Sequence, residues 1–543
     1  AEGNFTFTRG SNLSATRVNA SQLIEKGREN LALQSNQFDT TWGISGASRT
    51  SGQSGYDGLN NAWKIESTNT GQSRLNQAVS ISGVNTISFY AKAGTANYIM
   101  PYIIGSGDPR VFFNLSTGTI EQSVGTIDAS IEDAGNGWYR CSMAFDRTSN
   151  SLWIFIGNTN GSFNSAVGDS IYIQDAQLES SLVATPYIET GASTAQAGIL
   201  ENTPRLDYSG GATCPSLLLE PSRTNIITNS EYLGGSDWIK SGNGTGSVPV
   251  ITSNAAISPE GVKNATRVDL DLNGGTSSGD WSWVYQNFTS TGNDETFSMY
   301  VKAVDASNVG KVIAFGAVSF TAQSLTADWV RIESTSSAAV GGYGNGFRLR
   351  GTEGTSNTAS FYVFGIQHEQ NASYETSYIP TYGVSQTRAG EGKVLTGASN
   401  IIGQTEGSVY FEFTRDGFAA YTQRILTLSN GTNSNIIGFQ LAASNSITFY
   451  VINNDSLQAI ITKPNATIAN QKVKVAAGYA ENDFVLYIDG VQVGAATSGT
   501  IPSTSVVQNN RPTGGTPFIG NIYSTLLFPT RLTNAELAAL TTI

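Results

Sequence analysis

The chain has 543 residues, a formal net charge of −12 and charged side chains at only 13% of its positions. A chain of this length is expected to form three or four domains. Binding to phosphate backbones needs concentrated Lys and Arg, so the acidic balance without a basic cluster argues against a nucleic-acid partner. No apolar run is long enough to insert into a membrane, and no signal peptide is predicted.

The composition predicts an all-β protein. The chain has 59 glycines, and Ser, Thr and Asn alternate with Val, Ile, Phe and Tyr, which is typical of short strands joined by tight turns. Few segments show the apolar spacing of a helix. The two cysteines, Cys141 and Cys214, do not suggest a disulfide framework, and Cys141 is expected to be a small buried residue.

A phrase at residues 21–42 returns at residues 216–238, and the landmarks that follow each copy return in the same order. Such a pattern indicates a duplicated domain. Short strands with turn signals, in a domain of this size, favour a two-sheet sandwich of jelly-roll type. The predicted segments, in chain order, are a leader at 1–29, a first repeat at 30–190, a connector at 191–222, a second repeat at 223–388, a linker at 389–405 and a different domain at 406–543.

The last domain also reads as strands, with a hairpin turn at Asp489 and Gly490. One helix is predicted, at the end of the chain. Thr533 and Glu536 have the spacing of a capping box, and Leu532 and Leu537 stand at the hydrophobic-staple positions. The helix is short, so it needs a docking surface to be stable.

Few residues could carry catalysis. His368 is the only histidine, and any Ser-His-Asp or Cys-His machinery would have to use it. The first repeat has Leu178 there, so His368 is interpreted as a strand residue held by hydrogen bonds. Carboxylates are numerous enough for a glycosidase pair. Glu179 and Glu369 are repeated, however, and are interpreted as structural groups, with the repeated arginines as candidate partners.

One histidine and two scattered cysteines argue against an ordinary zinc site. Asp and Asn side chains of the last domain leave calcium open, although no EF-hand spacing occurs. We therefore expect no cofactor, with calcium as the open alternative.

Two further sets of residues are candidate site residues. A junction between modules is predicted at the repeated residues Glu25, Arg28, Glu220 and Arg223, which we expect to be partly buried at the seam.

The second set is Trp281, Trp283 and Tyr285. Aligning Gln286 with Gln77 directs these rings to the sheet face opposite the core, where the first repeat has the polar residues Gln72, Arg74 and Asn76. An aromatic face suits sugar stacking or a protein interface. The alternative is that a loop or neighbouring domain covers it.

Several segments together resemble a motif of tail-fibre, spike and head-fibre proteins of tailed bacteriophages. They lie at residues 5–11, 15–19, 204–208 and 215–225. The pieces usually stand close together in those proteins, whereas here the first repeat separates them, as though a module had been inserted. The repeats are likened to carbohydrate-binding modules. Residues 406–543 resemble a laminin-G or concanavalin-A-like lectin domain, on the segments 484–493, 518–523 and 531–533.

The resemblance implies a non-enzymatic virion protein on the exterior of a phage particle. Its expected partners are other virion proteins and a host-surface glycan, and a homotrimer is the implied assembly. Two other classes remain open. The chain could be a purely structural component of capsid or tail, or a subunit of a polysaccharide depolymerase.

Overall fold

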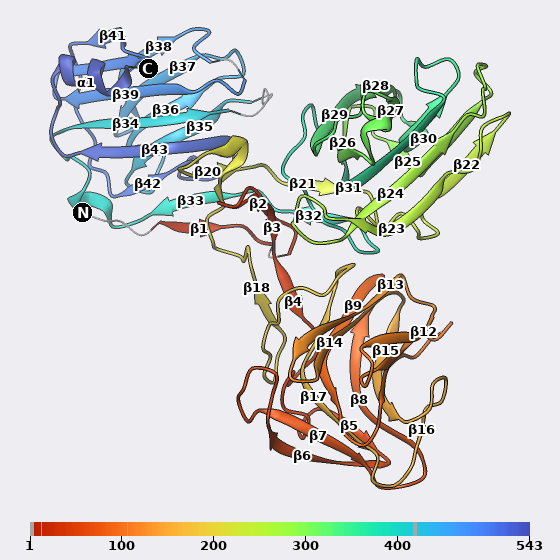
Figure 1. Cartoon of the computed structure of the whole chain (residues 1–543). Coiled ribbons are helices and arrows are strands. Elements are labelled where there is room, and N and C mark those ends of the chain that lie inside the picture. The colour runs from red at the N-terminus through yellow and green to blue at the C-terminus, as the bar shows by residue number, and fades with distance from the viewer. Residues whose placement is uncertain (1–4, 12, 106, 416–420, 468, 543) are drawn as a thin grey trace. The chain divides into compact units, whose positions relative to one another are not determined.

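The computed structural model describes residues 5–11, 13–105, 107–415, 421–467 and 469–542, and it is nearly all β (Figure 1). It contains two units. The first comprises Ala1–Glu25, Ile199–Arg223 and Thr387–Ile543, and the second comprises Lys26–Gly198 and Thr224–Gln386. The predicted all-β class is confirmed, as are two jelly-roll sandwiches, a third sandwich and a short terminal helix.

The first unit is a sandwich of two seven-stranded sheets. One sheet has the order β1 (Thr6–Thr8), β33 (Gly392–Leu395), β42 (Val506–Gln508), β35 (Gln423–Ser429), β36 (Ile436–Leu441), β37 (Ile447–Asn453) and β38 (Ser456–Lys463). The other has the order β19 (Leu206–Asp207), β20 (Ser216–Leu219), β43 (Gly520–Phe528), β34 (Glu406–Thr414), β39 (Val473–Ala480), β40 (Asp483–Ile488) and β41 (Val491–Ala496). A short pair, β2 (Thr16–Val18) and β3 (Ile24–Lys26), completes the unit's strands.

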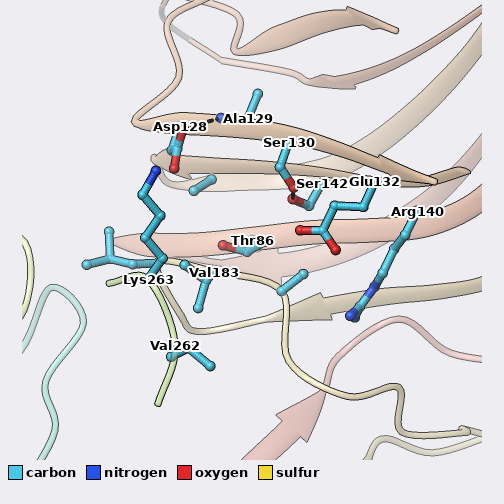
Figure 2. Close-up of a pocket in the computed structure, with 13 residues that line it drawn as sticks. Thr86, Asp128, Ala129, Ser130, Glu132, Arg140, Ser142, Val183, Val262 and Lys263 are labelled. Carbon is cyan, nitrogen blue, oxygen red and sulfur yellow. Dashed lines mark hydrogen bonds between the residues drawn. The ribbon is translucent and has the colours of Figure 1, made fainter. Parts of the chain in front are cut away.

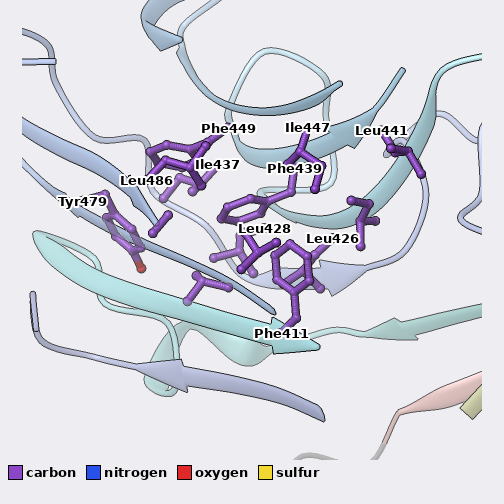
Figure 3. Packing of buried hydrophobic residues seen from close by; sticks show 14 of the residues in the cluster. Phe411, Leu426, Leu428, Ile437, Phe439, Leu441, Ile447, Phe449, Tyr479 and Leu486 are labelled. Atoms are coloured by element: carbon purple, nitrogen blue, oxygen red, sulfur yellow. The ribbon is translucent and has the colours of Figure 1, made fainter. Parts of the chain in front are cut away.

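Strand alternation builds the core of this sandwich (Figure 3). Along β37, Phe449 points into the core, whereas its neighbour Tyr450 points to the opposite face. Phe439 stacks on Phe449 with 5.1 Å between ring centroids, and it meets Phe411 of the facing sheet edge-on at 4.9 Å. These rings therefore join the two sheets into one core.

Leader and connector strands complete both sheets. In the first sheet β1 pairs with β33, placing Thr6 opposite Val394. In the second, β20 pairs with β43, placing Leu217 opposite Ile522. The chain leaves this unit after residue 25 and again after residue 223, returning at 199 and 387. Each jelly roll is therefore an insertion into one discontinuous framework.

The first repeat has two sheets. One has the order β12 (Thr119–Val124), β11 (Arg110–Asn114), β10 (Tyr98–Ile103), β15 (Ser149–Gly157), β8 (Gly71–Ile81), with β16 (Asn164–Ser165) and β5 (Gly43–Ser45) both on β8. The other has the order β13 (Asp128–Gly135), β14 (Trp138–Asp146), β9 (Val84–Ala93), β17 (Ser170–Glu179), β7 (Ala62–Ser67) and β6 (Ala47–Gln53). Separately, β4 (Arg28–Asn30) pairs with β18 (Ala195–Ala197). Cys141 is fully buried in the core between the sheets, as predicted, and neither cysteine forms a disulfide.

The second repeat repeats this plan. Its five-stranded sheet has the order β22 (Ile239–Asn243), β25 (Trp281–Ser290), β30 (Gly341–Arg350), β27 (Val312–Gly316) and β28 (Phe320–Ser324). The facing sheet contains β23 (Val250–Ala256), β24 (Ala265–Asp271), β31 (Thr358–Gln370), β26 (Asp294–Ala303), β29 (Val330–Ser337), β21 (Arg223–Asn225) and β32 (Gln386–Arg388).

The repeated phrase has a structural cause. Asn30 Nδ2 donates to the carbonyls of Ala176 and Ile188, at 3.2 and 2.7 Å. The equivalent Asn225 Nδ2 donates to two carbonyls of its own repeat, at 3.1 and 2.9 Å. Both amides are fully buried, where an unpaired polar group is costly. Each repeat therefore keeps this asparagine to bind its closing segment.

The predicted helix is present as α1 (Asn534–Thr541). Thr533 and Glu536 form the capping box, with the Thr533 N–H donating to the Glu536 carboxylate at 2.7 Å. Leu537 is fully buried against Tyr410 and Val485, so the short helix has the docking surface that it needs. Within the described part of the chain, no helix has the length and apolar character that crossing a bilayer requires.

Candidate functional site

Strand β25 presents the three predicted aromatic side chains on one sheet face. Val284 is fully buried in the core, whereas Trp281, Trp283 and Tyr285 are partly buried on the opposite face. The predicted alternation of this strand is thus confirmed. Its role in binding remains a prediction.

The rings form a compact group with β28 and β30. Trp283 stacks on Tyr285 with 3.9 Å between centroids and 22° between planes. The Arg348 guanidinium lies 5.1 Å from the Trp283 ring and 3.8 Å from that of Phe320. Gly344 leaves room for the stack, because a Cβ there would lie 2.9 Å from both the Trp283 and the Tyr285 ring. We call Trp283, Tyr285, Phe320 and Arg348 the aromatic shelf.

The shelf retains an unused donor. Trp283 Nε1 is buried and has no hydrogen-bond partner within the described residues, whereas Trp281 Nε1 donates to Ser241 Oγ at 3.4 Å. Arg348 is already paired, since its Nε donates to Glu353 at 2.8 Å. The partly exposed rings offer an apolar surface of the kind on which the C–H face of a sugar ring stacks.

The expectation that the first repeat leaves this face hydrophilic is wrong. Arg74 and Asn76 do lie there on β8, but β10 adds Tyr102, and β15 adds Trp153 and Phe155. A sheet face is composed of several strands, so aligning one strand could not reveal its character. The sequence of residues 152–156 did contain a signal. Trp153 and Phe155 alternate there with three aliphatic residues, which places the two aromatic side chains on the face opposite the aliphatic ones.

The four predicted junction residues are not equivalent in the structure. Glu25 is partly exposed and pairs with Arg17 at 2.9 Å. Glu220 is buried and binds two other arginines. Arg28 and Arg223 are partly buried, and their Nη1 groups donate to backbone carbonyls at 3.5 and 3.3 Å. Their predicted place at a seam between modules stays a prediction.

Glu179 does not pair with Arg28 in the first repeat. Its carboxylate accepts hydrogen bonds from the Thr185 N–H and Oγ1 at 2.9 and 2.6 Å. Glu369 accepts from the Thr376 N–H at 2.9 Å in the second repeat. The structural role predicted for both glutamates is confirmed. In the first repeat, however, Glu179 binds Thr185 of the following segment and not an arginine.

Glu220 belongs to a buried ion cluster in the first unit. Arg205 Nη2 lies 2.7 Å from Glu220 and its Nε 2.7 Å from Glu391. Arg388 lies 2.9 Å from Glu220, and Arg9 lies 3.0 Å from Glu391. Burial acts to lower the pKa of Arg205, but the two carboxylates outweigh it and raise it. Three distant parts of the sequence meet here, including pieces of the motif described above.

His368 is fully buried and held at both ring nitrogens, as predicted. Nδ1 lies 2.8 Å from Asn345 Nδ2, and Nε2 lies 2.9 Å from the Glu295 carboxylate. Burial lowers the pKa of His368, although Glu295 opposes this. Because both ring nitrogens have partners inside the protein, the contacts of His368 are those of a structural residue.

A polar hollow of about 390 Å³ lies in the second unit (Figure 2). Asp128, Glu132, Arg140 and Lys263 give its lining charges of both signs, and Lys263 extends toward Asp128. The Asp128 carboxylate accepts from Asn254 Nδ2 at 2.9 Å. None of the residues that line this hollow is aromatic, so it offers no stacking surface. Among the described residues, no three His, Cys, Asp or Glu side chains are placed so that they could hold a metal ion.

Comparison with known proteins identifies one domain. Residues 388–538 match the family model of the concanavalin A-like lectin/glucanases superfamily. The predicted lectin-like domain is confirmed, and the match begins before residue 406. None of the curated proteins matches this sequence.

Solved structures resemble part of the chain at low similarity. The Ruminococcus gnavus IT-sialidase CBM40 is 17% identical, covering 27% of this chain and 88% of its own, with a TM-score of 0.24. Domain 4 of a GH43 extracellular arabinanase from Geobacillus stearothermophilus, solved with arabinotriose, is 14% identical over 28% and 73%, with a TM-score of 0.23. A SAP-like pentraxin from Limulus polyphemus is 15% identical over 25% and 70%, with a TM-score of 0.22. Similarity at this level carries no argument about function.

Proposed function

We propose that this chain is a structural fibre or spike protein of a bacteriophage virion that binds glycan on the host surface. The observation that carries the binding role is the aromatic shelf, where Trp283 and Tyr285 stack beside the Arg348 guanidinium and the Phe320 ring. The lectin-type sandwich at residues 388–538 supports the same role. The proposed activity is adhesion, without catalysis and without a cofactor.

The virion role rests on the resemblance of residues 5–11, 15–19, 204–208 and 215–225 to a motif of phage fibre and spike proteins. Arg9, Arg205 and Glu220 of that motif lie in one buried cluster, which supports a common structural unit. Within this proposal the repeats keep the limits 30–190 and 223–388, and the module at 406–543 forms one sandwich with the strands β1, β33, β19 and β20 that precede it in the sequence. The chain forms a homotrimer, and this trimer contacts other virion proteins on the particle exterior. Shallow sites bind weakly one at a time, so a trimer would gain avidity.

Glycan binding is tested with the full chain on a glycan array, followed by calorimetry on any glycan that binds. Trp283→Ala is expected to cost about 2 kcal/mol, or roughly 30-fold in affinity, as a central aromatic contact does. Trp329→Ala is the matched control, because this partly buried tryptophan lies outside the shelf and donates to the Ile257 carbonyl. Unchanged binding in Trp283→Ala would refute the shelf as the site.

Three further measurements test the rest of the proposal. Antibody labelling of intact particles locates the chain, and a location inside the capsid contradicts host adhesion. Release of reducing ends from host polysaccharide would overturn the assignment as a non-enzyme. Binding measured with EDTA and with added calcium tests the independence from a cofactor.

A further inference from the structure

The first repeat carries an arginine with no partner on an aromatic surface. Arg74, on β8, holds its guanidinium 4.1 Å from the Trp153 ring and 5.7 Å from the Phe155 ring. Its Nε is buried, and the guanidinium makes no hydrogen bond or ion pair within the described ranges. A guanidinium has five N–H donors in a planar fork, and a buried donor without an acceptor is costly.

The surface around Arg74 has the shape of a platform. Strand register places Arg110, Tyr102, Trp153 and Asn76 in one row across β11, β10, β15 and β8. Tyr102 and Trp153 lie side by side, with 6.0 Å between ring centroids and 22° between planes. All four side chains of the row are partly exposed. The row therefore offers two nearly parallel rings between polar ends.

The second repeat contains the same pair of groups on exchanged strands. Aligning Gln77 with Gln286 makes Arg74 the counterpart of Trp283. On the adjacent strand, Phe155 stands opposite Arg74, and Arg348 stands opposite Trp283. Both repeats thus keep a guanidinium over aromatic rings on the same sheet face.

The two guanidinium groups differ in what they bind. In the second repeat, Glu353 accepts from both Nε and Nη2 of Arg348, a two-point contact that the chain supplies to itself. Among the described residues Arg74 has no such carboxylate, although its guanidinium also lies over aromatic rings. The second repeat thereby indicates that a guanidinium on such an aromatic surface binds a carboxylate.

We propose that the first repeat binds the carboxylate of an acidic saccharide at Arg74, with the sugar ring against Trp153 and Tyr102. The inference rests on the proposed glycan-binding function and names the ligand class for a site separate from the aromatic shelf. The carboxylate would pair with the Arg74 guanidinium, as the Glu353 carboxylate pairs with that of Arg348. Stacking on Trp153 holds the guanidinium in place, so little side-chain freedom is lost on binding.

The test uses the full chain and two probes with the same sugar backbone: tetragalacturonic acid, with free carboxylates, and its fully methyl-esterified form, with none. Calorimetry should detect the acid, and the ester should bind at least tenfold more weakly. Arg74→Met should reduce affinity for the acid at least tenfold without changing the response to the ester. Arg267→Met is the matched control, because this arginine forms an exposed pair with Asp269 and should leave both affinities unchanged.

Two additions keep the result interpretable. Trp153→Ala should weaken acid binding by removing the platform, and circular dichroism of each variant checks that the unit is folded. Equal acid affinity in the wild type and Arg74→Met, or equal affinity for acid and ester, overturns the proposal. If Trp283-dependent binding of other glycans persists in that case, the proposed function stands while the inference fails. If the wild type binds no glycan at all, the proposed function and the inference about Arg74 are both refuted.

Discussion

Removing the Arg205 guanidinium should strongly destabilise the first unit. Arg205→Met deletes the cation that bridges Glu220 and Glu391, and all three side chains are at most 7% exposed. Glu220 would keep its ion pair with Arg388, and Glu391 its ion pair with Arg9, but the guanidinium between the two carboxylates would be gone. Breaking a buried ion pair by removing one partner costs about 3–5 kcal/mol, since an uncompensated charge is left behind. For a unit of this size that corresponds to roughly 6–20 °C in Tm.

Arg17→Met is the matched control in the same unit. Arg17 and Glu25 are 22% and 31% exposed, and a pair so open to solvent contributes only about 0–1 kcal/mol. Differential scanning calorimetry of the full chain measures both variants, with hydrogen exchange of β1 and β20 to identify the unit that melts. Equal Tm values for the two variants would refute the claim that the cluster holds leader and connector in the sandwich.

Two pH-dependent effects are expected in the second unit. Burial lowers the pKa of His368 below its usual 6.5, so the unfolded chain takes up a proton that the folded state refuses, and stability is lost as the pH falls below 6.5. Urea unfolding at pH 7.5 and 5.5 should show this loss in the wild type and not in His368→Gln; an equal loss in both contradicts it. Burial and a hydrogen bond with Glu333 raise the pKa of Glu375 to about 8. The protonated carboxyl stabilises the folded state fully when the pH is below the usual pKa of 4.5, and this stabilisation is lost as the pH rises to about 8. Glu375→Gln should therefore flatten the dependence of Tm on pH over that range. A dependence that the substitution leaves unchanged would show that another group titrates.

Local patterns determined the class of structure. Alternation along β25 specified which side chains enter the core, because successive residues of a strand face opposite ways. The spacing of Thr533 and Glu536 specified where α1 begins, since the two side chains cap neighbouring backbone groups. The repeated Asn30 and Asn225 marked two copies of one fold, because each amide binds the closing segment of its own repeat.

The tertiary structure alone decided which distant segments meet. Paired strands can lie at any distance from one another in the sequence. The residues around Thr6 or Leu217 therefore do not indicate that these two complete the sheets of residues 387–543. The same holds for Arg205, whose partner Glu391 lies far along the chain. A sheet face likewise combines side chains from several strands, and Arg74 becomes a candidate site only when β15 sets Trp153 beside it. The sequence by itself therefore determined the strands and their faces, while the structure decided which faces became shared surfaces.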